Sequence, residues 1–146
     1  MTESTDTDPT DTAVPVAARD WATIEARDWD GFAELLADDV VYEMPQTRER
    51  IRGRAAYVRF NREYPGDWHV TVERLTGSGA HAATWTSFNV DGRTETGLAF
   101  LDLDDHGRIA RVTDFWPEPY DPPAGREHLV ERWLPVPDCA RSRSNL

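Results

Sequence analysis

Several features that often define a protein's chemistry are missing from this sequence of 146 residues. It contains a single cysteine, Cys139, so no disulfide can form within the chain and no cysteine-based zinc site is expected. The four histidines stand far apart, and no two of them have the i, i+4 spacing of a zinc-binding helix. We therefore expect neither a metal nor another cofactor.

Long hydrophobic runs and basic residues are also scarce. No apolar run approaches the roughly 20 residues that cross a bilayer. The sequence also does not begin with the charged and then apolar pattern that is typical of a secretory signal. These two absences predict a soluble, cytoplasmic protein with no membrane partner. Only 16 basic residues stand against 27 acidic ones, which gives a net charge of −11. Such a chain repels phosphate backbones, so nucleic acid is not an expected partner.

The common nucleophile and nucleotide motifs are absent as well. The sequence has no Gly-x-Ser-x-Gly elbow, no Gly-x-Gly-x-x-Gly after a predicted strand and no glycine-lysine phosphate loop. Any chemistry must therefore come from carboxylates, tyrosines or histidines inside a pocket.

The spacing of apolar residues predicts mainly helices in the first half of the sequence. Residues 1–13 are acidic and poor in apolar side chains, which predicts a disordered tail. Apolar residues at helical spacing then predict a helix over about 14–24, a short helix that starts at 29 and ends near 38–39, and a third helix over 53–64. Between the last two we expect a strand over 40–45 and a polar loop over 46–52.

From residue 68 the apolar period changes to two. Four strands are predicted at 68–76, 80–90, 94–104 and 108–116, joined by turns of hairpin type. This order predicts an α+β fold, a cone-shaped curved antiparallel sheet wrapped around three N-terminal helices. The domain would span residues 14–120. Residues 121–146 would form a C-terminal extension with a short helix over about 125–133.

The last predicted strand carries the best candidate for chemistry. Alternation places Val112, Asp114 and Trp116 on one face of this strand. In one interpretation Phe115 points into the core and Asp114 into water. In the other, Asp114 faces an apolar interior, where burial raises the pKa of its carboxyl group and suits it to general acid/base catalysis.

A family resemblance favours the second interpretation. It rests on Arg27-Asp28-Trp29-Asp30-Gly31-Phe32, the run from Leu35 to Pro45, Ile51-Arg52-Gly53, His106-Gly107-Arg108-Ile109 and Asp114-Phe115-Trp116. Over about residues 14–116 the chain resembles the SnoaL-like, polyketide cyclase-like branch of the nuclear transport factor two-like superfamily. That resemblance implies an apolar pocket at the open end of the cone, with Asp114 matching the acid/base aspartate of polyketide cyclases.

The resemblance and strand alternation together give a set of predicted pocket residues around catalytic Asp114. They are Trp116, Tyr42, Met44, Tyr57, Phe60, His69, Thr84, Thr86, Phe88, Ala99, Leu101 and Val112; Asn61 and Asp20 are further polar side chains expected to point inward. Departures from ketosteroid isomerases are equally informative. At the positions of their three working residues this chain has Met44, Ala99 and about Asp20, so we do not expect steroid isomerisation by their mechanism.

These observations predict a small, cofactor-independent enzyme. Asp114 would move a proton on a hydrophobic, carbonyl-bearing or polyketide-like substrate, in a cyclisation, isomerisation, dehydration or hydrolysis. The alternatives are a non-catalytic module that binds a small apolar ligand and a dimeric interaction protein of the same fold. If Asp114 points inward, alternation sends Trp85, Leu98, Phe100 and Phe115 outward, and this apolar patch predicts a homodimer through the outer sheet face.

Overall fold

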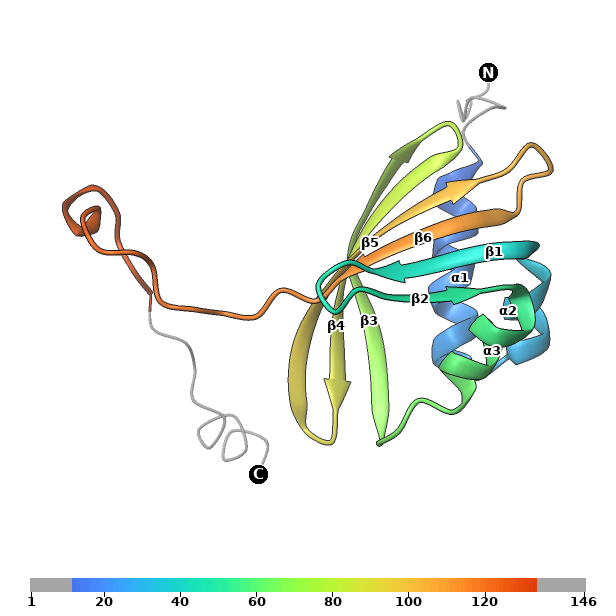
Figure 1. Ribbon diagram of the computed structural model, residues 1–146, viewed down its shortest axis with the longest axis horizontal. Coiled ribbons are helices and arrows are strands. Elements are labelled where there is room, and N and C mark those ends of the chain that lie inside the picture. Colours follow the sequence, from blue (N-terminus) through green and yellow to red (C-terminus); the bar gives the residue numbers. More distant parts are fainter. Residues whose placement is uncertain (1–11, 134–146) are drawn as a thin grey trace, which may run out of the picture.

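The computed structural model describes residues 12–133 and is shown in Figure 1; the predictions for residues 1–11 and 134–146 lie outside this range. Its helices are α1 (Ala13–Ala26), α2 (Trp29–Glu34) and α3 (Arg54–Arg62). The strands are β1 (Leu36–Met44), β2 (Glu49–Arg52), β3 (Trp68–Ser78), β4 (His81–Val90), β5 (Arg93–Leu103) and β6 (Ile109–Phe115), and a 3₁₀ turn η1 follows at Glu127–Leu129. The fold is therefore α+β, as predicted.

Each of the first two helices has a local cause in the sequence. In α1 the buried residues Ala13, Ala17, Asp20 and Ile24 recur every three or four positions, so one stripe of the helix faces the sheet. The Asp28 side chain caps α2 by accepting a hydrogen bond of 3.0 Å from the backbone N–H of Gly31. None of the described helices is long and apolar enough to cross a bilayer.

The six strands form one curved sheet in the order β2-β1-β6-β5-β4-β3, with the three helices gathered on one side of it (Figure 1). Strands β3 to β6 are the predicted antiparallel meander. The hairpin between β4 and β5 turns at Asp91 and Gly92, whose φ angles are 51° and 86°, and this pair of positive values suits a two-residue turn. The sheet is mixed rather than wholly antiparallel, because β1 pairs in parallel with β6.

Three predicted segments differ from the structure. The second helix ends at Glu34 instead of near 38–39, because residues from Leu36 onward join the sheet as β1. The predicted loop 46–52 contains β2, which pairs with β1 at the sheet edge. The helix expected over 125–133 is reduced to the single turn η1, which has no buried residue to hold a longer helix against the domain.

The outer face of the sheet carries the predicted apolar patch, formed by Trp85, Leu98, Phe100 and Phe115. The first three are 44%, 37% and 50% exposed, and the rings of Phe100 and Phe115 meet edge to face at 6.2 Å. The C-terminal extension projects away from the domain in Figure 1, and its Trp133 is 88% exposed. Within the described residues, this extension therefore does not cover the patch.

The homodimer stays a prediction, and sedimentation tests it. We expect the full chain to be a dimer at tens of micromolar, because two patches packed face to face would remove these rings from water. Trp85→Glu should shift the protein to monomer, since a buried charge would oppose the contact. Trp133→Glu, an equally charged change at an exposed tryptophan outside the patch, is the matched control. A monomeric unmutated protein contradicts the dimer.

Candidate functional site

Asp114 lies on the inner face of β6 and is 3% exposed. Its oxygen Oδ2 accepts two hydrogen bonds, one from the Tyr42 hydroxyl on the neighbouring strand and one of 3.1 Å from the Trp116 indole N–H. Its other oxygen, Oδ1, is buried and has no hydrogen-bond partner among the described residues. One oxygen therefore holds the carboxyl group in place, and the other has no donor among the described residues to stabilise its charge.

The protein environment changes how this carboxyl group titrates. Burial raises the pKa of Asp114 from 3.8 to about 6, although the hydrogen bonds from Tyr42 and Trp116 oppose the shift by favouring the charged form. Burial, and next the negative charge of Asp114, raise the pKa of the Tyr42 hydroxyl far above its usual value. Tyr42 therefore remains a hydrogen-bond donor while Asp114 exchanges a proton near neutral pH.

Asp114 opens into a cavity of about 260 Å³ between the helices and the sheet. Its lining comes from α1, α3 and every strand of the sheet: Trp21, Ile24, Tyr42, Met44, Thr47, Glu49, Tyr57, Phe60, Asn61, Tyr64, Trp68, Val70, Phe88, Glu95, Asp114 and Trp116. A second, more open cleft of about 530 Å³ shares Met44, Thr47, Asp114 and Trp116 with it and continues along residues 117–120. Asp114 therefore lies where the cavity adjoins the cleft along residues 117–120.

The structure brings together about half of the predicted pocket. Tyr42, Met44, Tyr57, Phe60, Phe88 and Trp116 line the cavity with Asp114, and Asn61 joins them. Thr84, Thr86, Ala99, Leu101 and Val112 are buried on the inner face of the sheet but are not among its lining residues.

His69 is the predicted pocket residue that the structure places elsewhere. Its side chain is exposed, and its ring nitrogen Nδ1 lies 2.8 Å from a carboxylate oxygen of Glu25. The same Glu25 carboxylate accepts a hydrogen bond of 2.8 Å from the backbone N–H of Val70. These contacts fix α1 against the edge strand β3 with Trp68 and Val70 inward, so alternation turns His69 outward.

Five apolar residues of the cavity were missed: Trp21, Ile24, Tyr64, Trp68 and Val70. The first three belong to the helical stripes of the sequence, but periodicity shows only that a side chain faces inward. It does not show whether that side chain fills the core or lines a space.

Asp20 is a second buried carboxyl group, on α1, and it is 1% exposed. Its Oδ1 atom also lacks a hydrogen-bond partner among the described residues. Burial, and next the charge of Asp114, raise its pKa from 3.8 to about 8. Asp20 is therefore neutral at the pH where Asp114 is charged, and like charges do not meet inside the domain.

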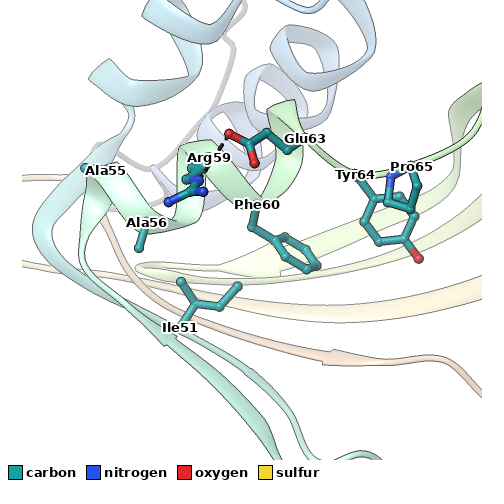
Figure 2. Close-up of a pocket in the computed structure, with 8 residues that line it drawn as sticks. All are labelled: Ile51, Ala55, Ala56, Arg59, Phe60, Glu63, Tyr64 and Pro65. Atoms are coloured by element: carbon teal, nitrogen blue, oxygen red, sulfur yellow. Dashed lines mark hydrogen bonds and ion pairs between the residues drawn. The ribbon is translucent and has the colours of Figure 1, made fainter.

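A larger groove lies along α3 and includes Ile51 of β2, and Figure 2 shows its lining residues. It measures about 640 Å³, and the ion pair between Arg59 and Glu63, with a length of 3.1 Å, is its charged feature. Phe60 and Tyr64 belong to both the groove and the inner cavity. We place the site in the smaller cavity because that is where the buried carboxyl group lies. Among the described residues no group of three or more metal-ligating side chains occurs.

The model of the SnoaL-like domain family matches residues 17–112, which is most of the folded chain. The chain belongs to the SnoaL-like family. No curated protein sequence matches it.

Solved structures agree with this assignment. A Kribbella flavida protein described as a candidate ketosteroid isomerase is 51% identical, with a TM-score of 0.80 over 86% of this chain and 91% of that one. An epoxide hydrolase of Mycobacterium tuberculosis is 23% identical, with a TM-score of 0.61 over 73% and 83%. A Xanthomonas campestris protein described as a candidate polyketide cyclase is 21% identical, with a TM-score of 0.60 over 73% and 90%. The last two likenesses show the fold alone.

Proposed function

We propose that this SnoaL-like protein is a cofactor-independent enzyme in which Asp114 is the general acid/base for a small hydrophobic substrate with a carbonyl group. The observation that supports this most is the arrangement of Asp114, a residue that lines the cavity. Its Oδ2 is held by Tyr42 and Trp116, and its Oδ1 is buried without a partner among the described residues. A pKa near 6 lets such a group take up and return a proton around neutral pH.

The reaction that this geometry supports begins at the carbon next to a carbonyl group. The Asp114 carboxylate removes a proton from that carbon, and the electron pair of the C–H bond moves toward the carbonyl oxygen. Asp114, now protonated, returns the proton to the same or another atom of the substrate. An isomerisation, a cyclisation or a dehydration would each use this proton transfer, and no other reactant is required for its first step.

Deuterium exchange tests the proposal without knowledge of the natural substrate. The probes are 2-tetralone, cyclohexanone and tropinone, three ketones whose exchangeable C–H groups are followed by NMR in D₂O. We expect the protein to accelerate exchange of at least one of them, with a rate that rises as pH passes about 6 and Asp114 loses its proton. Exchange at the buffer rate for all three ketones would overturn the proposal and favour the non-catalytic binding module.

The names of the solved relatives do not settle the reaction. The Kribbella flavida relative is described as a candidate ketosteroid isomerase, but the positions that we matched to the working residues of that enzyme class hold Met44, Ala99 and Asp20 here. Ala99 has no polar side chain, and Met44 offers no base. We therefore assign the proton transfer to Asp114 and propose no steroid substrate.

A further inference from the structure

The cavity that Asp114 lines is rich in aromatic and acidic side chains and has no basic side chain in its lining. Half of its lining residues are aromatic: Trp21, Tyr42, Tyr57, Phe60, Tyr64, Trp68, Phe88 and Trp116. Three more are acidic, namely Glu49, Glu95 and Asp114, and no lysine, arginine or histidine is among the lining residues. An anionic ligand would therefore find no cationic side chain in the lining, and the faces of the rings carry partial negative charge.

The rings surround the cavity as a connected series. Tyr42 stacks on Tyr57 with ring centroids 4.7 Å apart, and Phe88 meets Trp116 edge to face at 5.2 Å. Trp68 is tilted against Phe88 at 5.7 Å. Its ring already accepts a cation, because the Arg27 guanidinium lies 3.5 Å from a ring centroid of Trp68. Rings held in this way present fixed π surfaces to a ligand.

The carboxyl group of Asp114, which lines the cavity, adds a negative charge to this general attraction. Oδ1 is buried and unpartnered among the described residues, while Oδ2 is held by its two donors. The titratable groups that interact with this carboxyl group are Tyr42 from β1, Tyr57 from α3, Tyr64 from the segment after α3, and Asp20 from α1. None of these groups is a cation that would neutralise Asp114, so its charge is left for a ligand to balance.

We propose that the cavity binds a small organic cation, a hydrophobic molecule whose protonated tertiary amine or quaternary ammonium group sits among the aromatic rings and faces Asp114. The inference rests on the proposed function only in taking this cavity as the site, and it names the substrate class. A compact ammonium group with an apolar surface suits the aromatic walls, and its charge pairs with the buried carboxylate. Binding would place the substrate next to Asp114, and no basic side chain of the lining would be needed to hold it there.

Two ligands that differ in one atom test this inference. Choline carries a trimethylammonium group, and 3,3-dimethyl-1-butanol has the same shape with a neutral carbon in place of the nitrogen. We expect choline to bind at least about tenfold more tightly, measured by the change in tryptophan fluorescence on titration. We also expect choline, whose charge is permanent, to bind more weakly as pH falls through about 6 and Asp114 gains a proton. Equal affinities, or tighter binding of the neutral alcohol, would overturn the inference.

Variants separate the cation site from simple hydrophobic binding. Asp114→Asn and Phe60→Leu should each weaken choline binding about tenfold while leaving the binding of 3,3-dimethyl-1-butanol within about twofold. Trp133→Leu removes an exposed ring outside the cavity and is the control for aromatic content. If both ligands lose affinity equally in the Phe60 variant, the ring acts only as an apolar wall and the inference fails. Tight choline binding without ketone exchange would leave the cation site standing and remove the proposed enzyme function.

Discussion

Asp114→Asn is expected to reduce the rate of deuterium exchange into the ketone probes by at least about 100-fold, the lower range of general acid/base contributions. An amide oxygen does not take a proton from carbon near neutral pH, so the variant lacks the base. It still accepts hydrogen bonds from the Tyr42 hydroxyl and the Trp116 indole, which keeps the shape of the cavity. The measurement is exchange by NMR, with near-ultraviolet circular dichroism to compare the packing of the aromatic rings.

A matched control removes a carboxyl group elsewhere. Asp105 lies exposed in the turn between β5 and β6, so Asp105→Asn makes the same change in charge without touching the cavity. We expect this variant to exchange deuterium at the unmutated rate. Full activity in Asp114→Asn, with its circular dichroism unchanged, would contradict the role of Asp114 and direct attention to the other acids that line the cavity, Glu49 and Glu95.

The predicted fold and the observed fold agree where the signal is local. The period-2 pattern over 68–116 and the turn residues Asp91 and Gly92 fix the meander, because alternation and hairpin chemistry are properties of neighbouring residues. The parallel pairing of β1 with β6 joins segments that are far apart in the sequence, for example Tyr42 with Val112. No local pattern specifies that pairing, and it is this contact that brings the Tyr42 hydroxyl to Asp114.

The candidate site was predicted less completely than the fold. Alternation alone allowed Asp114 to face either side of its strand, and the family resemblance was needed to favour the inner side. For His69 alternation also left both faces open, and its expected place in the pocket was wrong. Its side chain is exposed and contacts Glu25, a residue of α1 that is far away in the sequence. Burial of Asp20 in an otherwise apolar stripe of α1 also depends on the whole fold. Periodicity identifies the position, but it does not report the pKa that the position imposes.

The buried carboxyl group of Asp20 is expected to have a large effect on how stability depends on pH. The carboxyl group of Asp20 has a pKa of about 8 in the folded protein against 3.8 for the ordinary side chain. As pH rises from about 4, the unfolded chain releases this proton while the folded chain keeps it, so the free energy of unfolding falls until pH reaches about 8. Asp114 adds a smaller loss of the same sign between about pH 4 and pH 6.

Asp20→Asn should therefore flatten the dependence of stability on pH. The amide does not titrate, so the variant keeps only the loss of stability due to Asp114. Between about pH 4 and pH 8 the variant should therefore avoid a decrease in the free energy of unfolding on the order of 5 kcal/mol. The measurement is the urea midpoint and slope at several pH values for the unmutated protein, Asp20→Asn and the control Asp105→Asn. The comparison uses the change with pH rather than the absolute stability, because the buried amide has its own desolvation cost. Parallel curves for all three proteins would show that Asp20 titrates normally and that its burial does not hold it neutral beside Asp114.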